Sequence, residues 1–85
     1  MSAMAAKKPA DQPLMRISQA AEAADVPKQT IEYYILLGLI SPLRRPGRRG
    51  RLFNVDLVKR IRLIHDLNES GYTLRAIRET YLRRR

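Results

Sequence analysis

Residues 30–40 read Thr-Ile-Glu-Tyr-Tyr-Ile-Leu-Leu-Gly-Leu-Ile, and this stretch predicts a short helix with a defined end. Gly38 follows the last expected helical residue, where the chain needs a left-handed backbone that glycine adopts at least cost. Ile31, Tyr34 and Ile35 are three and four residues apart and therefore share one helical face. The stretch thus predicts a helix with one buried face and one polar-aromatic face.

A second short helix is expected just before this one. Ser18 is a predicted N-cap, and residues 19–24 form the first helix. Residues 25–27 form a turn, and residues 28–37 form the second helix, which contains the stretch quoted above. Two short helices joined by a tight turn are typical of helix-turn-helix domains, whose second helix enters the major groove of DNA.

The chain continues with an arginine-rich segment and two further helices. Pro46-Gly47 predicts a turn between two extended pieces, which would form a two-stranded hairpin, or wing; a flexible loop is the alternative. Asn54 is a predicted cap of a third helix at about 55–70, and Thr73 caps a fourth at about 74–82. The predicted fold is mainly α, a winged helix-turn-helix of about four helices with a short two-stranded wing.

The length of 85 residues fits one domain. Residues 1–13 show no periodicity and predict a disordered N-terminal tail, residues 14–82 the domain, and residues 83–85 a basic C-terminal end. No apolar run approaches the roughly 20 residues of a membrane span, so a cytoplasmic, nucleoid-associated protein without a membrane partner is expected.

The composition argues against an enzyme. The chain has no cysteine, and its single histidine, His65, has no second histidine or cysteine with which to share a metal. The few acidic residues show no paired spacing with a nucleophile or a metal ligand. We therefore expect no catalytic residue, no metal and no cofactor, and we expect His65 to be a half-buried packing residue.

The net charge is +9, and most of the excess lies in two short blocks. Residues 44–51 contain five arginines, and residues 71–85 contain five arginines against one glutamate. A solvated surface explains scattered lysines, but it explains five arginines in eight residues less well. Because the planar guanidinium group fits phosphate, this clustering indicates a polyanion as partner.

Several motifs, in order, resemble the DNA-binding domain of the MerR family of bacterial transcription regulators. The resemblance covers about residues 15–82 and implies that the second helix, about 28–37, enters the major groove while the wing, 44–51, lies on the phosphate backbone. The matching segments are Thr30-Ile31-x-Tyr33-Tyr34, Leu37-Gly38-Leu39-Ile40-x-Pro42, Arg51-x-Phe53, Asn54 with Asp56, and Leu67 with Gly71-Tyr72-Thr73-Leu74 and Ile77.

The resemblance also implies a set of DNA contacts. At matching positions Thr30 and Tyr33 would contact DNA and the wing's Arg51 would contact phosphate, whereas Tyr34 is assigned to the core with DNA contact as the open alternative. The full candidate set is Lys28, Gln29, Thr30, Tyr33, Arg44, Arg45, Arg48, Arg49, Arg51, Tyr72 and Arg75.

Three features depart from the family pattern. Glu32 stands where the family usually has arginine, and a carboxylate beside phosphate is repelled unless it accepts from cytosine or pairs with a cation such as Lys28, four residues earlier. Gly50 stands where a tyrosine usually precedes the wing arginine, so a more mobile wing is expected. The family's dimerisation helix and effector domain are absent, which suggests a small stand-alone form.

The leading expectation is therefore a sequence-specific double-stranded DNA-binding transcription regulator, with self-association on DNA or as a homodimer left open. One alternative is an excisionase-like architectural factor that bends DNA. An RNA-binding or protein-interaction module is less favoured, because the deep, narrow major groove of double-stranded RNA does not admit a helix.

Overall fold

The computed structural model describes residues 13–82, with side chains described as far as Thr80. The helices are α1 (Ile17–Ala24), α2 (Lys28–Leu36), α3 (Val55–Glu69) and α4 (Leu74–Ile77), and α4 continues into a π-helical turn, η3 (Arg78–Leu82). Helix α1 packs against both α2 and α3, and α3 packs against α4. The predicted architecture of four helices is confirmed. Apart from Pro13, the predicted tail and the basic end at 83–85 lie outside the described residues and stay predictions.

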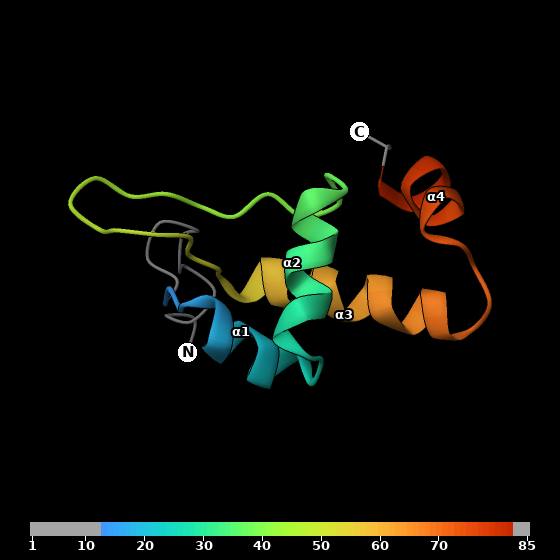
Figure 1. The fold of residues 1–85 in the computed structure, drawn as a ribbon, viewed down its shortest axis with the longest axis horizontal. Helices are drawn as coiled ribbons and strands as arrows, with labels where there is room; N and C mark the ends of the chain where they lie inside the picture. Colours follow the sequence, from blue (N-terminus) through green and yellow to red (C-terminus); the bar gives the residue numbers. More distant parts are fainter. Residues whose placement is uncertain (1–12, 83–85) are drawn as a thin grey trace, which may run out of the picture.

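The elements on either side of α2 extend in opposite directions (Figure 1). Residues 43–52 form a long arm on one side of α2. This arm contains the predicted wing, 44–51, and is called the wing from here on. Helix α4 and the loop that leads into it lie on the other side. Helix α2 therefore stands between two flanking segments; α1 packs against it, and α3 passes behind it in this view.

Helix α1 begins earlier than the sequence predicted. The N-cap position is Arg16, whose backbone N–H donates to Gln19 Oε1 at 3.0 Å and whose carbonyl accepts from the Ala20 N–H at 2.9 Å. The Gln19 side chain therefore accepts from the backbone N–H of the N-cap residue, which is one half of a capping box. Ser18 consequently lies inside the helix, and its prediction as N-cap is wrong.

Helix α2 ends as predicted. Gly38 has a φ of +80°, its N–H donates to the Ile35 carbonyl at 3.0 Å, and the Leu39 N–H donates to the Tyr34 carbonyl at 2.9 Å. These two bonds form the Schellman arrangement, which satisfies carbonyls at the helix end and turns the chain back. Leu39 and Ile40 are then buried in the core.

The core is apolar and lies where α1, α2 and α3 meet, with contributions from the wing exit and α4. Tyr34 is only 3% exposed, so its assignment to the core is confirmed. Burial, with a smaller contribution from the Glu69 carboxylate, raises the pKa of the Tyr34 phenol above its ordinary value. The largest fully buried side chains are Phe53, Ile31, Ile40, Leu52, Ile61, Ile64 and Ile77.

Arg62 fastens α3 to the end of α1. Its Nη1 donates to the Ala24 carbonyl at 2.8 Å, and its Nη2 lies 3.1 Å from Asp66 Oδ1. Asp25, which has a left-handed φ of 59°, places its Oδ2 3.9 Å from the same guanidinium. Arg62 therefore has a structural role, because its donors serve the carbonyl at the C-terminal end of α1.

The two-stranded wing is not confirmed. Between residues 13 and 82 the structure contains isolated bridges rather than strands, one joining Leu43 to Leu52 and one joining Met15 to Phe53. The turn at residues 46–47 does form, with the Arg48 N–H donating to the Arg45 carbonyl at 3.0 Å. Repulsion between arginines on the two arms opposes further pairing, so the wing is a loop closed at its base.

The structure predicts different outcomes at Asn54, which caps α3, and at Ser18, which lies within α1. Asn54 Oδ1 accepts from the Leu57 N–H at 2.9 Å at the start of α3. Replacing Asn54 with alanine should lower the free energy of unfolding by about 1 kcal/mol, and Asn54→Asp should restore most of it. Ser18→Ala should be neutral or slightly stabilising, because this serine lies within a helix. Urea unfolding followed by circular dichroism measures these changes; equal losses at the two positions would contradict the assigned caps.

Candidate nucleic-acid interface

Helix α2 exposes a polar face opposite the one that it buries. Lys28, Gln29 and Glu32 are exposed, Thr30 is half-buried, and Tyr33 is 51% exposed. Burial of Ile31 and Tyr34 fixes the rotation of the helix and so directs these side chains to solvent.

Leu36 also lies on the solvent side of α2. It is 79% exposed, which is unusual for a large apolar side chain, and it is separated from Tyr33 by three residues. Leu36 was not among the predicted site residues, although its spacing of three residues from Tyr33 places it on the same outward face.

An ion pair joins α2 to the wing. Arg51 Nη2 lies 3.5 Å from Glu32 Oε2, and the two side chains are 34% and 45% exposed. The partner of Glu32 is therefore the wing arginine rather than Lys28, the cation that the sequence offered as one alternative. Because both groups are partly solvated, the pair adds about 1 kcal/mol at most, so a phosphate or a base edge can compete for either member.

A second contact joins the wing to the start of α1. The Arg16 guanidinium donates to the Arg49 carbonyl, linking the start of α1 to the wing. Gly50 makes this approach possible, because a Cβ at that position would lie 2.9 Å from Arg16 Nη1, and its φ of +81° also favours glycine. The missing side chain of Gly50 thus leaves room for the Arg16 anchor, while the greater mobility that the sequence predicted for the wing stays a prediction.

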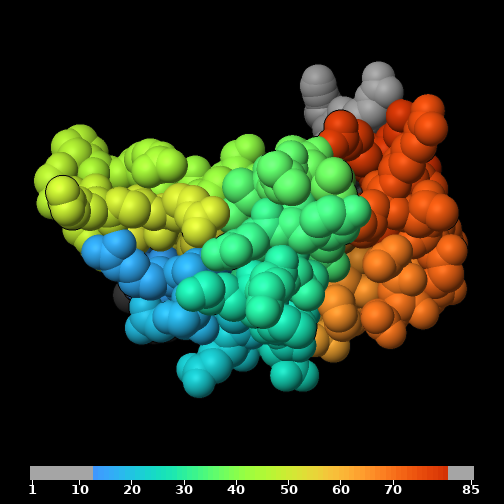
Figure 2. Space-filling view, viewed as in Figure 1, coloured from blue at the N-terminus to red at the C-terminus, as the bar shows by residue number. Residues whose placement is uncertain are grey.

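The remaining wing arginines form a positive cluster beside α2. Arg44, Arg48 and Arg49 are exposed, and the half-buried Arg45 donates from Nη1 to the Arg44 carbonyl at 3.3 Å. In the space-filling view the wing and α2 lie next to each other on one continuous face of the molecule (Figure 2). The wing and α2 are thus neighbours on this face, and Arg51 is the wing arginine whose contact with α2 the structure shows.

The other two candidates lie on the opposite flank of α2. Tyr72 is 46% exposed, its carbonyl accepts from Asn68 Nδ2 at 2.7 Å, and Arg75 is exposed at the start of α4. A hollow separates α2 from this flank; its lining residues are Gln29, Thr30, Tyr33, Tyr34, His65, Asn68, Glu69 and Leu74. Tyr72 and Arg75 therefore form a group separate from the wing. His65, whose side chain is 27% exposed, is half-buried as expected.

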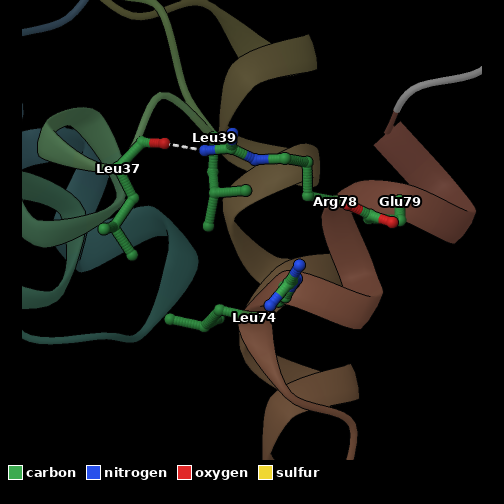
Figure 3. A pocket seen from close by; sticks show the side chains of 6 residues that line it. Leu37, Leu39, Leu74, Arg78 and Glu79 are labelled. Atoms are coloured by element: carbon green, nitrogen blue, oxygen red, sulfur yellow. Dashed lines mark hydrogen bonds between the residues drawn. The ribbon is translucent and has the colours of Figure 1, made fainter.

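Arg78 supports the far end of α2 (Figure 3). Its guanidinium donates to the Leu37 carbonyl, where α2 has run out of helical partners and where a cation is favourable. The side chain crosses a hollow of about 280 Å³ whose lining residues are Leu37, Leu39, Leu74, Arg75, Arg78 and Glu79. Neither Arg16 nor Arg78 was singled out from the sequence, because each contact joins residues more than 30 positions apart.

Two other kinds of site, a metal centre and a membrane-spanning helix, are not found among the described residues. Between Pro13 and Leu82 there is no group of three or more acidic, histidine or cysteine side chains placed to hold a metal ion. None of the described helices combines the length and the apolar character that are needed to cross a bilayer.

A short exposed helix, supported by two others and flanked by a basic loop, defines a helix-turn-helix domain. The family profile described as MerR HTH family regulatory protein matches residues 15–83. The chain belongs to this family. It is 37% identical over 62 residues to a mercuric resistance operon regulatory protein from Bacillus cereus, a match that covers 73% of this chain and 47% of that protein.

A solved structure has the same fold. The crystal structure of a MerR-family transcriptional regulator from Bacillus cereus superposes with a TM-score of 0.73 at 25% identity, covering 86% of this chain and 55% of that one. The chain therefore spans about half the length of the relatives that it matches.

The Arg16 anchor can be tested through the base of the wing. In Arg16→Ala, the amide protons of Leu43 and Leu52, which form the bridge there, should exchange about fivefold faster, as expected for the loss of about 1 kcal/mol of local stability. Nuclear magnetic resonance measures the exchange, and Arg48→Ala is the matched control because Arg48 is an exposed arginine of the same loop. Equal rates in both variants would mean that Arg16 does not hold the wing.

Proposed function

We propose that this protein is a sequence-specific double-stranded DNA-binding transcription regulator that inserts α2 into the major groove and lays the wing on the phosphate backbone. One observation carries the proposal: an arginine-rich loop lies beside the exposed face of α2. Arg51 links this loop to α2, and Arg16 links it to the start of α1. Membership of the MerR HTH family supports the same conclusion.

The first turns of α2 would contact base edges. In helix-turn-helix complexes the N-terminal residues of the second helix reach the bases, and here these are Lys28, Gln29 and Thr30. A glutamine amide pairs with adenine through two hydrogen bonds, and a lysine suits guanine or phosphate. Tyr33 and Leu36 follow along the same face, and Leu36 suits the methyl group of thymine.

The two flanks would hold the backbone. Arg44, Arg45, Arg48 and Arg49 place positive charge on one side of α2, and Tyr72 with Arg75 offers polar groups on the other. Phosphate would neutralise the wing arginines and so remove the repulsion that opposes pairing of the two arms; we therefore expect the two-stranded form of the wing on DNA. A protein with this partner would act at the nucleoid, in the cytoplasm.

Selection from a random pool tests the proposal. The protein is bound to 30-base-pair duplexes of random sequence at several salt concentrations, and the bound fraction is sequenced. An enriched motif with steep salt dependence supports a sequence-specific regulator, and the number of motif copies per duplex shows whether single copies or pairs bind. Salt-dependent binding without a motif would favour an architectural role, and the absence of duplex binding would refute the proposal.

The wing should supply much of the salt dependence. Replacing Arg48 and Arg49 with alanine should weaken binding to all duplexes and lower the slope of log affinity against log salt by up to about 1.8, since each phosphate contact releases about 0.9 counterion. The control is Lys59→Ala with Arg60→Ala, which removes the same charge from exposed positions on α3. Fluorescence anisotropy across a salt series gives the slopes. Equal effects of the two double variants would remove the wing from the interface.

A further inference from the structure

Glu32 is the one acidic residue of α2, and it stands among the side chains that would face DNA. It is an exposed residue one helical turn from Lys28 and from Leu36, and one position from Tyr33. A carboxylate at this place cannot contact phosphate favourably, because both groups are negatively charged. In a complex with DNA, this position would therefore favour a partner cation or a donor on a base.

The structure supplies the cation on one side of the carboxylate. Among the described residues, Arg51 is the cation within 4.0 Å of Glu32, and its Nη2 approaches Oε2 at 3.5 Å. The side chain of Glu32 remains 45% exposed, and none of the described residues donates a hydrogen bond to Oε1. The arrangement therefore positions the carboxylate through one oxygen and leaves the other able to accept a further hydrogen bond.

The edges of the bases differ in what they offer such an acceptor. In the major groove cytosine presents the N4 amino donor, whereas guanine and thymine present acceptor oxygens that repel a carboxylate. Adenine presents an amino donor beside the N7 acceptor, so it suits a carboxylate less well than cytosine does. The chemistry of the major groove thus ranks cytosine first for Glu32.

We propose that Glu32 is a specificity-determining residue that accepts a hydrogen bond from the amino group of a cytosine, and that Arg51 is the positioning residue that orients its carboxylate. The inference rests on the proposed function, since it assumes that α2 lies in the major groove. It gives the ion pair a role beyond stability: the pair joins base selection by α2 to the placement of the wing.

The test measures base preference rather than affinity alone. Starting from a duplex selected by the wild-type protein, each position is changed to the other three base pairs, and dissociation constants are measured at one salt concentration. The wild-type protein should prefer cytosine at one position by about 5- to 150-fold over guanine or thymine. Glu32→Ala should reduce that preference to less than threefold while binding to unrelated duplexes becomes tighter, because a negative charge has been removed.

Two further variants sharpen the expectation. Glu32→Gln should shift the preference at that same position towards adenine, because the glutamine amide can donate to N7 as well as accept from N6. Arg51→Ala should weaken the preference for cytosine, and Arg51→Lys should restore part of it by keeping a cation beside Oε2. A residue that acts only through charge or through folding would change affinity at all positions and leave the ranking of bases intact.

The control is Glu22→Gln, which makes the same change of charge at an exposed position on α1 and should leave the preference unchanged. Far-ultraviolet circular dichroism checks that each variant folds, as expected for changes at partly exposed side chains. An enriched motif whose base preferences do not change in Glu32→Ala and Glu32→Gln would overturn this inference and leave the proposed function standing. Absence of duplex binding by the wild-type protein would overturn both.

Discussion

Burial of one face of α2 determines how this helix sits against the core and which of its side chains reach solvent. Ile31 is fully buried and Tyr34 is 3% exposed, so the rotation of this short helix is fixed by apolar packing. The Schellman turn at Gly38 then returns Leu39 and Ile40 to the same core. Because the inner face is fixed, the opposite face of α2 is the one that stays exposed to solvent.

The wing depends on the same core through its exit. Leu52 and Phe53 are fully buried, so the base of the loop is fixed even though its arms do not form strands. Arg16 and Glu32 then hold the wing from two sides, one through a backbone carbonyl and the other through an ion pair. Clustering the wing arginines costs little free energy, because their side chains remain in contact with solvent.

The local pattern of the sequence predicted the helices well and the long-range contacts poorly. The inner face of α2, the turn at Gly38 and the cap at Asn54 depend on neighbouring residues, so spacing and residue type were sufficient to find them. The predicted N-cap of α1 was wrong because the helix begins directly after Arg16, whose backbone N–H donates to the Gln19 side chain. Residue preferences alone do not distinguish this start from one at Ser18. The partner of Glu32 was missed because Arg51 comes near only when the loop folds back.

Nuclear magnetic resonance can show whether α2 and the wing together form one face for DNA. The ¹⁵N-labelled protein is titrated with a duplex from the selection, and the backbone amide shifts are followed. The largest changes should fall on the first turns of α2 and on residues 43–52, with smaller changes near Tyr72 and Arg75. Changes confined to α3, or to the hollow between Leu39 and Arg78, would contradict this arrangement.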